Sequence, residues 1–251
     1  MNDAHYSIPM TDNFYASRSQ DIFCLIPARG GSKSIARKNL IRINGVSLVE
    51  LAVNSAKIEG PENLSIVVSS DDLEILQLSV ELGVKPVERS INASNDQATA
   101  SQVVSEFIET LKSTSGEINR ESIIIYLQPT SPMRSVRHVQ EALKVYYSNK
   151  LPVVSVTEVS QIPEKMLRLN EVGQLEPLIL GSNPAQNRQS FKSTLIPNGA
   201  VYIFSIADFE RISDIPVLGA IPYAMSAEDS IDLDNPFDIK IAELLASPRS
   251  N

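Results

Sequence analysis

Apolar residues follow two repeating spacings along the chain, one typical of buried strands and the other of helices. Four continuous apolar runs predict short buried strands, at residues 21–27, 64–70, 122–129 and 152–159. Apolar positions three and four apart predict four helices, over residues 47–58, 71–83, 98–111 and 135–148. Ser47 is the expected N-cap of the first helix, and Gly83 the expected stop of the second. The predicted fold class is α/β, a mainly parallel sheet with helices on both faces.

The strand–helix rhythm is interrupted between about residues 160 and 195 and returns at 198–204. Residues 165–178, "KMLRLNEVGQLEPL", predict a β-hairpin that turns around Val172 and Gly173. Residues 1–20 are polar and lack the apolar core of a signal peptide, so we expect a flexible leader. The predicted organisation is one domain over residues 21–251, with an inserted arm at about 160–195.

Composition narrows the function class. The chain has 43% hydrophobic residues and a net charge of −8, which excludes general nucleic-acid binding because that requires a basic face. Its apolar runs are far shorter than the roughly 20 residues that span a bilayer, so we expect no membrane partner. The single cysteine, Cys24, lies in a strand pattern and predicts a buried, inert thiol in a reducing compartment, the cytoplasm.

The positive charge is concentrated in one place. Between Ile22 and Val49 there is no acidic residue, whereas five basic residues fall there: Arg29, Lys33, Arg37, Lys38 and Arg42. Taken alone, this stretch is compatible with a solvated basic loop. However, it directly follows one predicted strand, as residues 127–134 ("LQPTSPMR") follow another. Ligands of parallel sheets bind where strands end, so this position favours a site for a small polyanion.

The basic stretch "IPARGGSKSIARKN" (26–39) matches neither of two common phosphate-binding loops. Ser32, not glycine, precedes Lys33, and the adjacent pair Gly30 and Gly31 lacks a third spaced glycine. A glycine pair still lets backbone N–H groups approach phosphate oxygens, and Arg29 and Lys33 would add charge-assisted hydrogen bonds. We therefore expect this loop to hold phosphates.

A second candidate lies in "EDSIDLD" (228–234). If this segment is a strand, Asp232 and Asp234 point to the same side, a few ångströms apart. Paired carboxylates suit Mg²⁺ bound to a triphosphate, so the predicted cofactor is Mg²⁺. The alternative is an acidic turn at the end of a strand, and the neighbouring phosphate loop favours the metal.

Four motifs in this order resemble the acylneuraminate cytidylyltransferases, or CMP-sialic acid synthetases: residues 26–39, 127–134, 198–203 ("NGAVYI") and 229–234 ("DSIDLD"). The resemblance runs from about Ile22 to Leu245. It implies a fold like that of nucleotide-diphospho-sugar transferases, and transfer of CMP from CTP to the anomeric hydroxyl of a nine-carbon sialic-type sugar acid. It also implies a homodimer in which the arm reaches the partner subunit.

The resemblance assigns roles to particular residues. The catalytic residues would be Arg29, Lys33 and Lys38. The nucleotide would be bound by Ala28, Arg29, Gly30, Gly31, Ser32, Lys33, Asn39 and Arg89. Gln128 and Arg188 would contact the sugar acid, and Asp232 and Asp234 would bind the metal.

The sequence departs from the family pattern at Ser34 and Ala36, where glycine and proline are usual, and at Ile196, where sialic-acid enzymes commonly have arginine. Ile196 offers no donor to a carboxylate or hydroxyl, which favours a sugar with more methyl surface, such as legionaminic or pseudaminic acid. Two alternatives stay open. One is a nucleotidyltransferase for another sugar acid or a sugar phosphate, and the other is a non-catalytic nucleotide-sugar-binding homologue.

Overall fold

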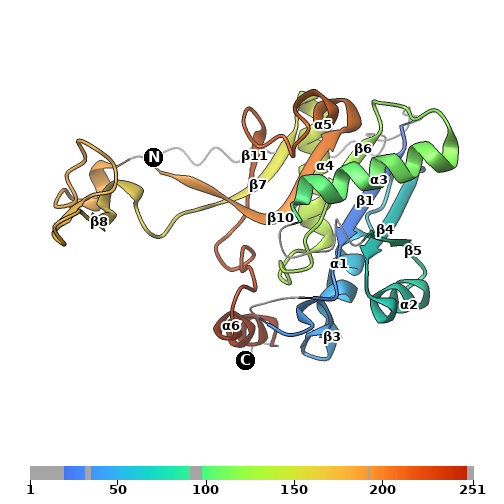
Figure 1. The fold of residues 1–251 in the computed structure, drawn as a ribbon, viewed down its shortest axis with the longest axis horizontal. Coiled ribbons are helices and arrows are strands. Elements are labelled where there is room, and N and C mark those ends of the chain that lie inside the picture. The colour runs from blue at the N-terminus through green and yellow to red at the C-terminus, as the bar shows by residue number, and fades with distance from the viewer. Residues whose placement is uncertain (1–19, 32–34, 91–97, 192, 248–251) are drawn as a thin grey trace.

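The computed structural model describes residues 20–31, 35–90, 98–191 and 193–247. At its centre is a seven-stranded sheet (Figure 1). From one edge to the other the strands are β11 (Ile221–Ala224), β7 (Val153–Glu158), β10 (Leu195–Ser205), β6 (Ile123–Tyr126), β1 (Ile22–Pro27), β4 (Leu64–Ser70) and β5 (Lys85–Glu88). Only β10 runs antiparallel to its neighbours. The predicted mainly parallel sheet is confirmed.

Helices cover both faces of the sheet. Within the described residues they are α1 (Leu48–Ala56), α2 (Leu73–Glu81), α3 (Ala100–Ser115), α4 (Val136–Asn149), α5 (Ile206–Ile212) and α6 (Pro236–Ala246). Helices α1, α2 and α4 pack on one face, and α3 and α5 on the other. The four predicted helices are all present, whereas α5, α6 and β11 were not predicted.

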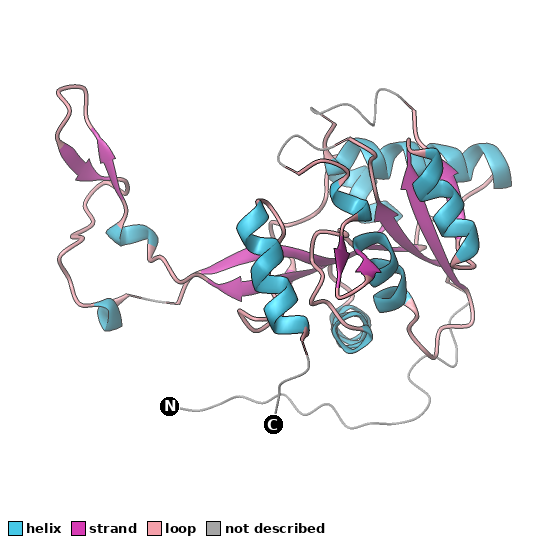
Figure 2. Cartoon of the chain, turned by 90° about the horizontal axis from the view of Figure 1, so that it is seen from below, coloured by secondary structure: helices cyan, strands magenta, loops and turns pink. Residues whose placement is uncertain are grey.

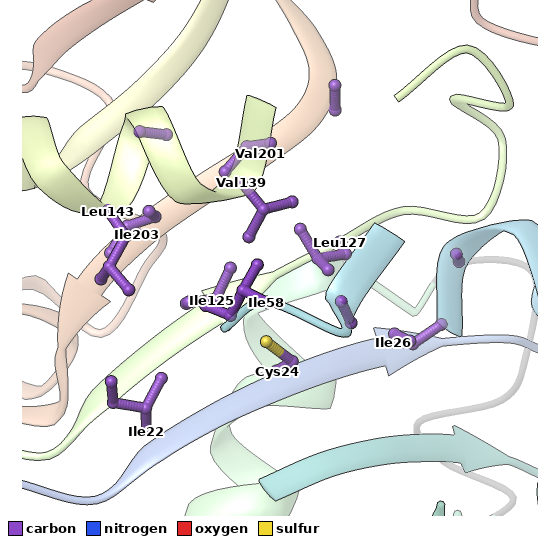
Figure 3. Close-up of a cluster of buried hydrophobic side chains, with 14 of the residues drawn as sticks. Ile22, Cys24, Ile26, Ile58, Ile125, Leu127, Val139, Leu143, Val201 and Ile203 are labelled. Carbon is purple, nitrogen blue, oxygen red and sulfur yellow. The ribbon is translucent and has the colours of Figure 1, made fainter. Parts of the chain in front are cut away.

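Alternate side chains along β6 are apolar on both faces of the sheet, which explains why helices pack on both faces. Ile123 and Ile125 lie in a cluster with α1 and α4, whereas Ile124 and Tyr126 lie in a cluster with α3 and α5. Figure 3 shows part of the first cluster, in which Cys24 of β1 lies between apolar side chains. Burial raises the pKa of the Cys24 thiol to about 12, so the predicted inert thiol is confirmed.

Caps at the helix starts fix where the loops after the strands begin and end. The Ser47 side chain accepts a hydrogen bond from the backbone N–H of Glu50, as the predicted N-cap of α1. Thr99 forms a capping box with Gln102 at the start of α3. Strands β1, β5 and β6 run parallel, so their carboxyl ends lie at one edge of the sheet, where the first turn of α3 also lies.

Smaller elements complete the chain. A short hairpin, β2 (Arg42–Ile43) and β3 (Val46–Ser47), precedes α1, and the described residues include 3-10 turns at Lys38–Leu40, Pro163–Lys165 and Arg188–Ser190. No helix in the described ranges is long and apolar enough to cross a membrane.

The segment between β7 and β10 projects away from the sheet (Figures 1 and 2). It contains the hairpin of β8 (Leu167–Leu169) and β9 (Leu175–Pro177), paired in antiparallel register. This hairpin lies within the stretch where the sequence predicts one, and Gly173 adopts a positive φ of 80° in its turn. Much of the arm's apolar surface is exposed, including Leu169, Val172, Leu175 and Leu180.

Candidate active site

A cleft of about 390 Å³ opens where β1, β5 and β6 end. It is lined by Pro27, Arg29, Gly31, Lys38, Asn39, Arg89, Ala98, Thr99, Ala100, Val103, Tyr126, Gln128, Pro129, Thr130 and Asp234. Three of these are cations and one is an acid. The cleft therefore has the place and the charge that the sequence predicts for a polyanion site.

The five basic residues of the first loop separate in the structure. Arg29 and Lys38 line the cleft. Arg37 instead forms ion pairs with Asp72 at 3.2 Å and with Glu74 at 2.8 Å, at the start of α2. Arg42 donates to the carbonyl of Gly45 in the β2–β3 hairpin. Lys33, together with Ser32, lies outside the described residues.

The backbone of this loop is fixed by its neighbours. Ala28 is buried, and its N–H donates to the carbonyl of Ser69. The Asn39 side chain is also buried and donates to the carbonyl of Arg29 at 2.8 Å. Asn39 thus both lines the cleft and braces the residue that supplies a cation, a second role that the sequence did not indicate.

Two acidic residues that follow β4, Asp71 and Asp72, lie beside Gly30. The Gly30 N–H donates to Asp71 Oδ1 at 2.9 Å, so in this conformation it bonds a carboxylate where a phosphate was expected. A Cβ at Gly30 would lie 2.7 Å from Asp72 Oδ2, which explains glycine at this position. The same Asp72 caps α2 through the N–H groups of Glu74 and Ile75.

Arg89 follows β5 and is buried beside the cleft, with 7% of its surface exposed. Its guanidinium donates to the Ser69 carbonyl at 2.6 Å and to the Ser69 hydroxyl at 3.2 Å. Burial lowers the pKa of Arg89, and the nearby groups Tyr126 and Asp71 act in the opposite direction. Arg89 is thus a buried cation in the wall of the cleft, held in place by its hydrogen bonds to Ser69.

The cleft shares Gln128, Thr99 and Ala100 with a second cavity of about 650 Å³. The second cavity is lined by Thr99, Ala100, Ser101, Gln128, Tyr202, Ile212, Asp214, Ile215, Val217 and Leu218. Its wall combines aliphatic side chains with polar groups, among them a hydrogen bond from the Ser101 hydroxyl to the Asp214 carboxylate. Two ligands could therefore meet at Gln128.

Asp232 and Asp234 flank Leu233 in a segment without regular secondary structure, so the predicted strand at these residues is wrong. Leu233 is fully buried and its N–H donates to the Thr130 carbonyl at 2.9 Å, whereas Asp232 and Asp234 are exposed. Asp234 lines the cleft and pairs with Lys38 at 3.3 Å. Asp232 lines neither cavity.

The donor set of this pair suits a hard cation. Desolvation raises the pKa of Asp232, the hydrogen bond with Thr130 acts in the opposite direction, and the charge of Asp234 raises the pKa further. A nearby dication would favour the ionised form of Asp232, and carboxylate oxygens are ligands that Mg²⁺ prefers. In the described part of the chain no group of three or more His, Cys, Asp or Glu side chains occurs that could hold a metal ion.

The arm stands apart from both cavities. Arg188 lies in the 3-10 turn Arg188–Ser190, and its side chain is outside what the structure describes. Ile196 belongs to β10, where it is half exposed and pairs in register with Thr157. Ile196 lines neither of the two cavities described above.

Comparison with known proteins identifies the family. The family described as Cytidylyltransferase matches residues 23–178, more than half of the chain. The chain belongs to the cytidylyltransferase family. The resemblance found in its motifs is confirmed.

Among the relatives of this cytidylyltransferase, the N-acylneuraminate cytidylyltransferase of Streptococcus agalactiae serotype V is 30% identical over 84% of this chain and 50% of the relative. N-acylneuraminate cytidylyltransferase B of Danio rerio is 32% identical over 87% of this chain and 50% of the relative. The pseudaminic acid cytidylyltransferase of Campylobacter jejuni serotype O:2 is 32% identical over 61% of this chain and 65% of the relative. The chain spans about half the length of the N-acylneuraminate relatives.

Solved structures with the same fold include a CMP:2-keto-3-deoxy-manno-octonic acid synthetase complexed with CTP, with a TM-score of 0.62 and 16% identity over 90% of this chain and 98% of that one. A 4-diphosphocytidyl-2C-methyl-D-erythritol synthase gives a TM-score of 0.63 at 15% identity, over 91% of this chain and all of that one. At this identity the likeness shows the fold, which is the nucleotide-diphospho-sugar transferase fold predicted from the motifs.

The sequence reasoning missed several residues of the site in this cytidylyltransferase. Asp71 and Tyr126 come at strand ends already recognised, so their positions alone could have marked them. Thr99 gives the threonine–glutamine spacing of a capping box, a signal for a helix start beside the cleft. Asp214 lies between an unpredicted helix and an unpredicted strand, and no local pattern points to it.

Proposed function

We propose that this chain transfers CMP from CTP to the anomeric hydroxyl of a nine-carbon sialic-type 2-keto sugar acid, releasing pyrophosphate. The observation that carries the proposal is the pair of adjoining cavities that share Gln128, Thr99 and Ala100. One is cationic and lies where nucleotides bind in α/β sheets, and the other has an aliphatic wall with hydrogen-bonding groups. The names of the relatives support the same substrates.

The first cavity is suited to CTP. Arg29 and Lys38 line it together with the buried Arg89, and the sequence adds Lys33 to the same loop. In phosphoryl transfer the protein contributes mainly position and charge stabilisation. Arg29, Lys33 and Lys38 would stabilise the charge that gathers on the α-phosphoryl group and the leaving pyrophosphate, while Arg89 would contact the nucleotide base.

Asp232 and Asp234 would hold the Mg²⁺ ion. When bound, the ion would supply positive charge that offsets the charge of the triphosphate. The protein residues prepare this site in two ways. The backbone bond between Leu233 and Thr130 fixes the segment that carries both carboxylates. The 3.3 Å ion pair with Lys38 keeps Asp234 at the wall of the cleft.

The second cavity is suited to the sugar acid. Gln128 stands at its boundary with the CTP cavity, where the anomeric hydroxyl must approach the α-phosphate. The Asp214 carboxylate accepts hydrogen bonds and repels anions, so the sugar would turn hydroxyl or amide N–H groups toward it and its own carboxylate away. Ile215, Val217 and Leu218 offer an aliphatic surface to an acyl substituent.

The functional unit that we propose is a homodimer. The hairpin of the arm exposes Leu169 at 68%, Val172 at 77% and Leu175 at 69%, and has no core of its own. Apolar surface of this kind favours contact with a second copy. In such a dimer the arm would bring Arg188 to the sugar pocket of the partner subunit.

The test is a pyrophosphate-release assay of the purified chain with Mg²⁺. CTP is expected to support turnover and UTP is not, with N-acetylneuraminic, legionaminic and pseudaminic acids offered as acceptors. If Ile196 sets the choice of sugar, kcat/KM is at least about tenfold higher for a di-N-acyl sugar than for N-acetylneuraminic acid. Turnover of a sugar phosphate in place of every sugar acid would refute the proposed acceptor class, and binding of CTP without turnover would favour a non-catalytic homologue.

A further inference from the structure

Strand β10 contains an irregularity next to the site. Its register against β7 shifts between Pro197 and Tyr202, and within this stretch Gly199 adopts a φ of 76°. Only glycine takes such a conformation without strain. Bulges of this kind redirect side chains and are common beside active sites.

Gly199 leaves a space that another residue fills. A Cβ at this position would lie 2.5 Å from Gln128 Oε1, closer than real Cβ contacts allow, and 3.7 Å from Gln128 Cδ. The amide oxygen of Gln128 therefore rests where any other side chain at position 199 would begin. Glycine is required here for two independent reasons, the backbone conformation and the neighbouring amide.

The two backbones at this contact are tied in place. The buried guanidinium of Arg134 donates from one nitrogen to the carbonyls of Gln128 and Ala200, at 2.8 and 2.9 Å. Its Nε donates to the hydroxyl of Ser55 on α1 at 2.9 Å. The segment that follows β6 and the middle of β10 therefore share one donor and cannot separate without exposing it.

A second set of hydrogen bonds holds the bulge from the other side. The Asn198 side-chain oxygen accepts from the Ser155 hydroxyl at 2.5 Å and from the Ala200 N–H at 3.2 Å, and its amide donates to Ser230 at 2.8 Å. With both backbones fixed, the softest way to relieve a clash at position 199 is rotation of the Gln128 side chain. Its amide is the free end of a flexible chain.

We propose that Gly199 is a positioning residue for Gln128, and that the bulge in β10 exists to seat the Gln128 amide at the boundary of the two cavities. The kinetic effect expected from this inference rests on the proposed function, because Gln128 is the residue expected to contact the sugar acid. The seating itself depends only on the contact between residues 128 and 199.

The first experiment measures the seating without any substrate. In Gly199→Ala, a crystal structure and the side-chain amide resonances of Gln128 are expected to show the amide displaced from its position in the wild-type protein. The matched control is Gly83→Ala. Gly83 has a φ of 73° and nothing within 4 Å of an added Cβ, so this change reproduces the backbone strain alone. An undisplaced Gln128 amide in Gly199→Ala would overturn the proposal.

The second experiment is a double-mutant cycle. Gly199→Ala is expected to raise the KM for the sugar acid about three- to tenfold, the range for losing one neutral hydrogen bond, and to leave the KM for CTP within about twofold. Gln128→Ala should do the same, and the double variant should match Gln128→Ala because the residue that Gly199 seats is gone. Additive effects, or an unchanged KM for the sugar, would count against the positioning role.

Folding supplies a further outcome. If Gly199→Ala fails to fold but the double variant with Gln128→Ala folds, the clash with the amide is the cause and the proposal stands. If both fail while Gly83→Ala folds, Gly199 serves the backbone alone and the proposal is wrong. Should the wild-type protein turn over none of the sugar acids, the proposed function fails, and the displacement of the Gln128 amide still decides the role of Gly199.

Discussion

Replacing Asp234 by asparagine separates the catalytic role of this carboxylate from any role in folding. The Asp234 side chain is 77% exposed, and its ion pair with Lys38 spans 3.3 Å. Lys38 is only 12% exposed, but water screens the pair on the side of Asp234, so we expect it to contribute about 1 kcal/mol or less to stability, and asparagine keeps an oxygen for the lysine. We therefore expect the free energy of unfolding to change by less than about 1 kcal/mol.

The expected effect on turnover is much larger. Loss of a metal ligand that fixes charge at the reacting phosphate costs roughly 10²-fold or more in kcat, equivalent to about 2.7 kcal/mol. The assay is pyrophosphate release across a series of Mg²⁺ concentrations, with thermal unfolding measured on the same samples. Glu243→Gln, which removes an exposed carboxylate on α6, is the matched control and should leave both measurements unchanged.

Two results would refute the reasoning. Near-normal turnover in a folded Asp234→Asn protein would remove Asp234 from the metal site. A large loss of turnover with an unchanged dependence on Mg²⁺ would instead assign Asp234 to holding Lys38 in the cleft.

Three further predictions concern other parts of the molecule. Arg29→Ala should lower kcat more than it raises the KM for the sugar, because its partner is the triphosphate in the transition state; a mainly raised sugar KM would contradict this. Burial lowers the pKa of His138 below 6.5, so stability is lost as the pH falls below that value, where the unfolded chain takes up a proton first. His138→Gln keeps a side chain that can complete the capping box of α4. This variant should show a smaller drop in melting temperature between pH 7.5 and 5.5 than the wild-type protein. An equal drop in both proteins would exclude His138 as its source. Lysine at both Leu169 and Leu175 should leave the fold intact and convert a dimer into a 27.5 kDa monomer by light scattering, whereas a wild-type protein that is already monomeric would refute the dimer.

Local pattern was sufficient for most of the fold because burial on a sheet or under a helix imposes a period on the sequence. The strand predicted at residues 64–70 agrees with β4, and Ser47 caps α1 as its sequence position suggests. The same reasoning missed α6, whose apolar positions, such as Phe237 and Leu244, stay largely exposed. A period reports burial, so an element with little burial gives a weak signal.

The candidate site was predicted in part, for a related reason. The sequence placed a basic loop and "LQPTSP" at one edge of the sheet, since parallel strands end on the same side. It could not tell that Arg29 and Lys38 face the cleft while Arg37 turns to α2, because that depends on the path of one loop.

The sequence by itself determined the order of most strands and helices up to residue 159, the acidic balance with one basic loop, and the four motifs that resemble the family. Only the tertiary structure decided which distant residues meet. Lys38 and Asp234 are 196 positions apart, and the seat that Gly199 gives to Gln128 depends on a bulge in one antiparallel strand. Periodicity is a local property of the chain, whereas these contacts are set by strand register and loop conformation, which depend on packing across the whole domain.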